Sequence, residues 1–208
     1  MIDYLILVNR ENRITDDYYK NIIKPSIIEV EPFKNNELIY RTFKIEEKKT
    51  YLEKLTSEKF TQLRNYAKEQ GVILGITSGF LTFEQQQYKY DYFLEKHGKE
   101  FAEKSACMAG YSEHNTGLAL DVDIFKNLKW GGIAVQKDGS IIPEAEWLHS
   151  ELYKFGFILR YPKGAEHITK MKFEPWHIRY VGESVAKYIY ENKITFEEYH
   201  QQKNNENI

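Results

Sequence analysis

Two polar segments that lie far apart in the chain constrain the fold more than any other feature. One contains His114 and Asp121, and the other contains Glu174 and His177. Two imidazoles and a carboxylate, with a fourth position left to water, are typical of a catalytic zinc site, whereas a structural site usually closes with a fourth protein ligand. A fold that uses these residues together has to bring the two segments to one place.

The residues after Gly117 predict a buried strand with a polar face. Strict alternation over residues 118–122 places Leu118 and Leu120 on one side, and Asp121 and Asp123 on the other. A carboxylate on a buried strand needs a partner, and a metal ion is one of the few good ones. The pattern therefore favours Asp121 as a metal ligand.

Glu174 and His177 lie three residues apart around Pro175. In a regular strand they would face opposite sides, and a helix tolerates proline only in its first turn. We therefore expect an irregular backbone, whose geometry the sequence leaves open. Metal-assisted hydrolysis needs a general base beside the ligands, and Glu174 is available for it. The residue types alone leave open whether this is a metal site or a set of capping and surface residues.

Hydrophobic periodicity predicts an α+β fold with a small, mainly antiparallel sheet flanked by helices. The pattern predicts helices over residues 46–70, 82–97, 99–106, 143–155 and 184–192 and from 195 onward, and strands over 4–8, 72–76, 118–122, 157–161 and 176–181. Thr82 with Gln85, and Thr195 with Glu198, have the spacing of capping boxes that begin helices.

The chain is expected to form a single domain over residues 1–208, since no repeat or linker divides it. Residues 1–45 are predicted to be largely irregular, with a short strand near Ile28, and residues 201–208 to form a frayed tail.

Composition excludes several classes of partner. A net charge of -2 gives no electrostatic case for nucleic acid or an anionic membrane. No stretch approaches the roughly 20 apolar residues of a membrane span. The first residues lack the features of a signal peptide, so a cytoplasmic protein is expected. The single cysteine, Cys107, excludes an internal disulfide and is expected to be a buried small hydrophobe.

The chain resembles the zinc D-alanyl-D-alanine peptidases of the VanY and VanX type, whose fold the hedgehog signalling domain shares. The resemblance rests on Ser-x-His-x6-Asp followed by Glu-x-Trp-His, and it covers nearly the whole chain. It includes residues 7–9, 78–80, 117–121, 156–162, 168–169 and 174–182. It is strongest to the bifunctional VanXY type, which is both a D,D-dipeptidase and a D,D-carboxypeptidase.

The resemblance implies a Zn²⁺ site whose ligands are His114, Asp121 and His177. It implies that Glu174 is the general base, that Ser112 lies near the substrate carboxylate, and that Gln86 contacts substrate. The implied substrates are the free D-Ala-D-Ala dipeptide, the end of a peptidoglycan precursor peptide, or both. Such enzymes support glycopeptide resistance.

One departure from the family pattern is at Leu81. Family members usually have an arginine there, which assists the substrate carbonyl or carboxylate. Losing one donor to a developing oxyanion costs on the order of 2.7–4 kcal/mol. Arg179, predicted on the same strand face as His177, is a candidate substitute. The alternative is that Arg179 forms a structural ion pair, with Asp123 as a candidate partner.

Two other hypotheses follow from this departure. The first is another enzyme of the superfamily, such as an L,D-carboxypeptidase or a lysin-type endopeptidase. The second is a zinc-bound, weakly active protein that binds peptidoglycan. Retention of Glu174 argues against the second, because a binding protein does not need the base.

Overall fold

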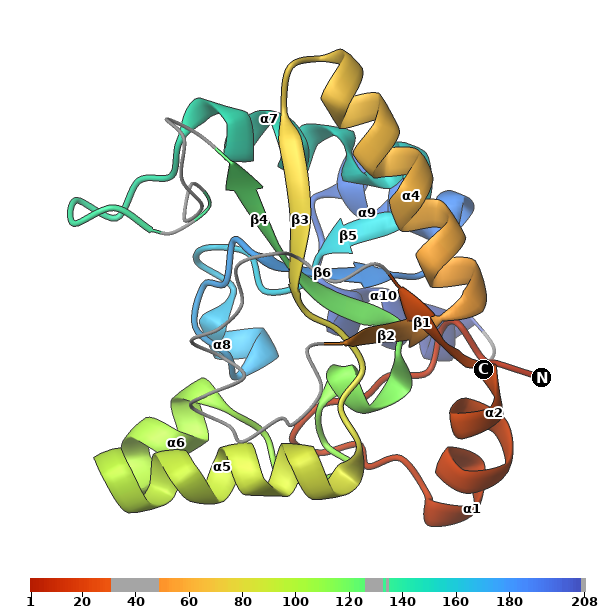
Figure 1. Ribbon diagram of the computed structural model, residues 1–208, viewed down its shortest axis with the longest axis vertical. Coiled ribbons are helices and arrows are strands. Elements are labelled where there is room, and N and C mark those ends of the chain that lie inside the picture. Colours follow the sequence, from red (N-terminus) through yellow and green to blue (C-terminus); the bar gives the residue numbers. More distant parts are fainter. Residues whose placement is uncertain (31–48, 126–132, 134, 207–208) are drawn as a thin grey trace.

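The computed structural model describes residues 1–30, 49–125, 133 and 135–206 (Figure 1). All of its strand pairs are antiparallel: β1 (Ile27–Val30) pairs with β2 (Thr50–Glu53), and the larger sheet has the order β3-β4-β6-β5. The strands of the larger sheet are β3 (Ile73–Ser78), β4 (Ala119–Phe125), β6 (His177–Tyr180) and β5 (Phe157–Leu159). The predicted α+β class with a small antiparallel sheet is confirmed.

Helices surround this sheet. The longer ones are α4 (Lys54–Glu69), α5 (Phe83–His97), α7 (Pro143–Glu151), α9 (Glu183–Asn192) and α10 (Phe196–Glu206). The shorter ones are α1 (Asp16–Tyr18), η1 (Tyr19–Ile23), α2 (Lys24–Ser26), α6 (Lys99–Ser105), η2 (Glu113–Thr116), η3 (Leu152–Phe155) and α8 (Glu166–Thr169). In Figure 1, α4 and α7 lie around the upper part of the sheet, and α5 and α6 lie below it.

Both predicted capping boxes are present. The N–H of Gln85 donates to the Thr82 hydroxyl at 3.1 Å, and the N–H of Thr82 donates to the Gln85 side chain at 2.9 Å. The same reciprocal pair joins Thr195 and Glu198 at the start of α10. These bonds satisfy backbone donors that the first turn of a helix otherwise leaves unpaired.

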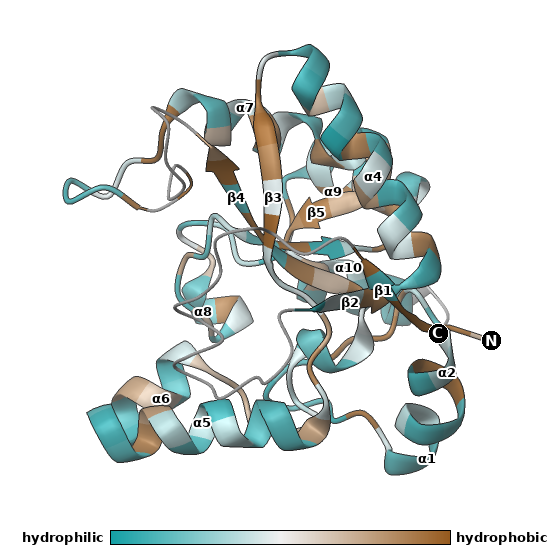
Figure 2. Cartoon of the chain, viewed as in Figure 1, coloured by the Kyte–Doolittle hydropathy of each residue, from teal (hydrophilic) through white to brown (hydrophobic). Residues whose placement is uncertain are grey.

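The main core lies on one face of the larger sheet. Leu120 and Val122 of β4 point into it and pack with side chains from α4 and α7, such as Leu63 and Leu148. In Figure 2, β3, β5 and part of β4 have hydrophobic colours, whereas much of the helical ribbon is coloured as hydrophilic. The alternation predicted for β4 is therefore confirmed, and Asp121 belongs to the opposite face of the sheet.

The N-terminal prediction was wrong in two places. Residues 4–8 form no strand, because the carbonyls of Tyr4 and Ile6 accept hydrogen bonds from the Arg179 side chain, at 3.1 and 3.0 Å, instead of from a neighbouring strand. Residues 16–26 are helical rather than irregular: Thr15 caps the first turn, and Pro25 is the second residue of α2, which follows η1 directly. The predicted strand near Ile28 is confirmed as β1. Residues 31–45 of that prediction lie outside the described residues.

Two more local predictions needed correction. The predicted frayed tail is helical up to Glu206, because α10 is anchored by Phe196 and Tyr199 in a second apolar cluster. Residues 50–53 of the helix predicted over 46–70 are instead strand β2, which pairs with β1, and residues 46–48 lie outside the described residues. Within the described parts of the chain, no helix has the combination of length and apolar character needed to cross a membrane.

Candidate metal centre

Neighbouring strands bring Asp121 and His177 together. The two residues are directly opposite each other in the register of β4 and β6, so their side chains share a face. His114 comes from η2, just before Gly117, whose φ of +73° turns the chain into β4. A Cβ at Gly117 would lie 2.8 Å from the backbone nitrogen of Glu53, so the turn requires glycine.

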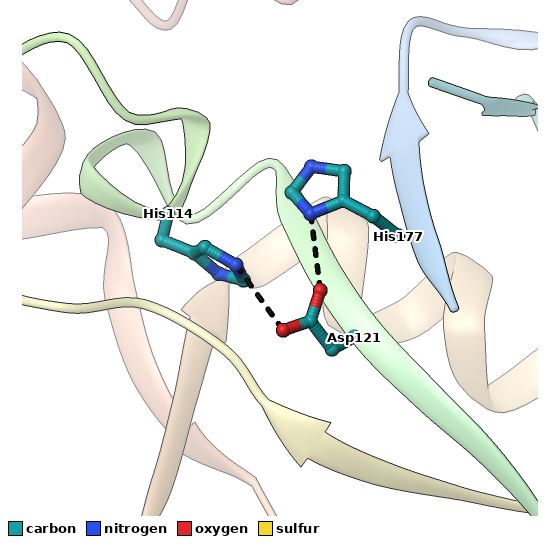
Figure 3. A group of neighbouring side chains, drawn as sticks. All are labelled: His114, Asp121 and His177. Atoms are coloured by element: carbon teal, nitrogen blue, oxygen red, sulfur yellow. Dashed lines mark hydrogen bonds and ion pairs between the residues drawn. The ribbon is translucent and has the colours of Figure 1, made fainter. Parts of the chain in front are cut away.

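The three predicted ligands converge, as Figure 3 shows. One ligand atom from each lies within 4.8 Å of the others. The Asp121 carboxylate lies between the imidazoles, with Oδ1 3.0 Å from Nδ1 of His177 and Oδ2 3.4 Å from Nε2 of His114. The structure therefore places the three predicted ligands in one cluster.

The outer nitrogens of both imidazoles are held by acceptors. Nδ1 of His114 donates to the Gly79 carbonyl at 2.8 Å, and Nε2 of His177 lies 3.4 Å from Oε2 of Glu113. These contacts leave Nε2 of His114 and Nδ1 of His177 facing the centre of the cluster. Metal-binding histidines usually donate their second N–H to a carbonyl or a carboxylate in this way. The residues present therefore fit a divalent metal ion such as zinc.

His177 is the candidate ligand whose protonation would compete with a metal. Burial lowers its pKa, but hydrogen bonds to Asp121 and Glu113 outweigh burial and raise the pKa to about 9. The two imidazoles hold the pKa of Asp121 well below its usual value despite its burial. At neutral pH, His177 without a metal therefore carries a proton that a bound ion has to displace.

Zinc binding at pH 7 is therefore expected to release about one proton, and the affinity to rise about tenfold per pH unit up to about pH 9. Calorimetric titration in buffers with different enthalpies of ionisation measures the number of protons released. His167→Ala, which removes an exposed imidazole on α8, is the control and should not alter that number. An affinity that is independent of pH between 7 and 9 would contradict this assignment.

Glu113 contacts the candidate metal site and was missed by the sequence reasoning. Its Oε1 accepts from Nε of Arg160 at 2.7 Å and from Nη1 of Arg179 at 2.9 Å, with all three side chains fully buried. Burial raises the pKa of Glu113, but the two guanidinium groups outweigh burial and hold that pKa far below its usual value. Arg160 and Arg179 both lie in apolar segments that were predicted as strands. A buried guanidinium requires a carboxylate partner, so these two residues could have indicated a buried carboxylate such as Glu113.

The prediction that Arg179 binds substrate was wrong. The side chain is fully buried, does not line the pocket, and bonds to Glu113 and to the carbonyls of Tyr4 and Ile6. The alternative of a structural ion pair is correct, although the carboxylate is Glu113 and not Asp123.

A pocket of about 270 Å³ is lined by the three candidate ligands and by the other predicted site residues apart from Arg179. Ser112, Gln86 and Glu174 all line it. Gln86 is buried, and its Nε2 donates to the Cys107 carbonyl at 2.7 Å, while its Oε1 has no partner among the described residues. Cys107 is itself buried, as expected.

The segment around Glu174 is an irregular turn, as Pro175 predicted. The N–H of Glu174 donates to the Tyr161 carbonyl at 3.2 Å, and the N–H of His177 donates to the Glu174 carbonyl at 3.1 Å. Nε2 of His149 in α7 lies 2.8 Å from the Pro175 carbonyl. Burial raises the pKa of the Glu174 carboxyl. The turn therefore holds a carboxyl with an elevated pKa beside the metal ligands.

Two imidazoles and a carboxylate, with a further carboxyl beside them, form the arrangement of a mononuclear metallohydrolase. The family model described as "VanY: D-alanyl-D-alanine carboxypeptidase" matches residues 49–183, and the chain belongs to this family. The resemblance seen in the sequence is thereby confirmed.

Individual relatives agree with the family assignment. A D-alanyl-D-alanine carboxypeptidase of Enterococcus faecium is 33% identical over 196 residues, which is 94% of this chain and 56% of that protein. The LD-carboxypeptidase LdcB superposes with a TM-score of 0.77 at 31% identity, covering 95% of this chain and 86% of that one. A zinc complex of a D,D-pentapeptidase VanY variant from a VanB-type resistance cassette superposes with a TM-score of 0.71 at 30% identity. The match covers 95% of this chain and 99% of that one. The chain spans between 56% and 65% of the length of the curated relatives it matches.

Proposed function

We propose that the protein is a zinc-dependent D,D-peptidase that hydrolyses the bond between two D-alanines. The substrate is the end of a peptidoglycan precursor peptide, the free dipeptide, or both. The observation that carries the proposal is the position of Glu174, a carboxyl with an elevated pKa that lines the same pocket as the three metal ligands. The family and its relatives supply the substrate class.

In this proposal, three side chains hold the metal ion and a fourth transfers protons. When bound by His114, Asp121 and His177, Zn²⁺ lowers the pKa of a water molecule and polarises the carbonyl of the scissile bond. Glu174 takes a proton from the attacking water and returns it to the leaving amine. An elevated pKa suits both transfers, because it brings the carboxyl closer to the working pH.

Two further groups orient the substrate in this proposal. The unpartnered Oε1 of Gln86 accepts an N–H of the peptide, which removes the cost of a buried unsatisfied acceptor. The hydroxyl of Ser112, which also lines the pocket, donates to the substrate carboxylate.

The test is the release of D-alanine by the zinc-loaded protein. The substrates are D-Ala-D-Ala, a pentapeptide ending in D-Ala-D-Ala, and a tetrapeptide ending in an L-residue followed by D-alanine. We expect release from at least one of the first two, abolished by a chelator and restored by added zinc. The ratio between the two substrates distinguishes dipeptidase from carboxypeptidase activity. Absence of release from both would contradict the proposal.

A second candidate is an L,D-carboxypeptidase, favoured by the TM-score of 0.77 with LdcB. It shares the proposed metal site and general base and differs in the configuration accepted before the scissile bond. Release of D-alanine only from the tetrapeptide would support this candidate.

A further inference from the structure

One face of α5 forms a wall of the pocket. Gln86, Lys89 and Phe93 all line it, and their spacing of three and four residues places them on a single helical stripe. With a rise of 1.5 Å per residue, this stripe runs about 10 Å along the pocket. Gln86 lies at the end near Cys107, and Phe93 contacts Phe101 of α6 at 5.7 Å between ring centroids.

The pocket needs positive charge if it is to hold an anionic peptide end. Asp121 and Glu174 both line it and carry carboxyl groups. The side chain of Leu81 is not among the described lining residues, and its backbone instead bonds to His114 and Asn115. The buried guanidinium of Arg179 is held by Glu113, away from the pocket. Among the described lining residues, the cationic side chains are Lys89 and Lys172.

The two lysines differ in their surroundings. Nζ of Lys172 lies 3.4 Å from the Ser105 hydroxyl and 5.8 Å from the ring centroid of Phe101, so it belongs to the end of the pocket at α6. Lys89 lies one helical turn from Gln86. Burial raises the pKa of Glu174 and lowers that of His114, and the charge of Lys89 lowers both pKa values, while the charge of Lys172 also lowers that of Glu174. Lys89 is thus placed between the metal ligands and the aromatic end of the pocket.

We propose that Lys89 binds the C-terminal carboxylate of the peptide substrate and makes the pocket selective for a free chain end. The inference rests on the proposed function for the identity of the substrate. Its geometric basis is the position of two groups on α5. Oε1 of Gln86 is a buried acceptor without a partner among the described residues, and Lys89 lies one helical turn away. The terminal residue of a peptide presents the matching groups, an N–H and a carboxylate on either side of one Cα. The cation also offsets the repulsion between that carboxylate and Asp121 or Glu174.

Binding measured without turnover tests this inference. Calorimetry on zinc-loaded protein in a Glu174→Gln background compares D-Ala-D-Ala with its C-terminal amide. We expect Lys89→Met to weaken binding of the free acid by about 10- to 100-fold, the range of a charge-assisted hydrogen bond, and to change binding of the amide little. Lys89→Arg should retain most of the affinity for the acid, and the control Lys172→Met should affect acid and amide alike.

Equal weakening of acid and amide in Lys89→Met would overturn the inference. So would a Lys172→Met effect on the acid as large as that of Lys89→Met, or an absence of acid binding before Lys89 is changed. A failure of the proposed function would give a different result. The free acid would still bind in a manner that depends on Lys89, but the protein with Glu174 intact would release no D-alanine from any substrate.

Discussion

Glu174→Gln is expected to lower kcat for D-alanine release by about 10²- to 10⁴-fold, the usual contribution of general acid–base catalysis. The amide has nearly the same size as the carboxyl and can fill the same place in the turn. It cannot accept a proton from water, so the loss should fall on the chemical step. KM should change little, because in the proposed mechanism Glu174 acts on the attacking water and the leaving amine rather than on the bound ground state.

The same variant, Glu174→Gln, distinguishes a general base from a metal ligand. The three ligand atoms that lie within 4.8 Å of one another belong to His114, Asp121 and His177, and Glu174 is not part of that cluster. Zinc affinity of Glu174→Gln should therefore remain close to that of the wild-type protein in a competition titration with a chromogenic chelator. Glu166→Gln, an exposed substitution on α8, is the matched control and should change neither quantity.

Two results would contradict this role for Glu174. A large loss of zinc affinity in Glu174→Gln would make the residue a ligand. An unchanged kcat would assign the proton transfers to another group. Urea unfolding of the metal-free variant provides the necessary check on folding. Because Glu174 is a buried carboxyl whose pKa burial raises, its neutral replacement should not destabilise the protein.

The parts of the fold that could be predicted from sequence depend on local rules. The capping box at Thr82 is a contact between residues three apart, and the alternation in β4 is fixed by the period of a strand. Local rules do not predict the cluster of His114, Asp121 and His177, because Asp121 and His177 meet only through the register of β4 and β6. The sequence of neither strand determines that register, so the predicted set of three ligands came from the family resemblance.

The parts that could not be predicted depend on long-range polar contacts. Arg179 bonds to Glu113, 66 residues earlier in the chain, and to the Tyr4 carbonyl, 175 residues earlier. These bonds hold residues 4–8 out of a strand and turn the guanidinium away from the pocket. Propensity and periodicity describe only neighbours in sequence, so the apolar pattern of residues 4–8 gave the wrong element.

Replacing Glu113 is expected to affect both stability and the metal site. Glu113→Gln removes the carboxylate that accepts from Arg160 and Arg179 at 2.7 and 2.9 Å. Breaking a buried ion pair by removing one partner costs about 3–5 kcal/mol, because a buried charge is left uncompensated. We therefore expect the free energy of unfolding of the metal-free protein to fall by about that amount, as measured by urea titration.

The effect on the metal arises from a different contact of the same carboxylate. Oε2 of Glu113 lies 3.4 Å from Nε2 of His177 and orients the imidazole toward the site. Losing such a partner typically costs about 10- to 100-fold in metal affinity. The loss should therefore appear in a zinc competition titration carried out at a temperature where the variant remains folded.

Glu197→Gln is the matched control for this prediction. Glu197 is also a buried carboxylate on Arg160, at 2.6 and 2.8 Å, but among the described residues it bonds to Arg160 and Asn9 and not to His177. The control should lower the free energy of unfolding and leave zinc affinity near that of the wild-type protein. If both variants weakened zinc binding equally, Glu113 would act on the metal only through the stability of the fold. If only Glu113→Gln did so, the hydrogen bond to His177 would be the direct support of the metal ligand.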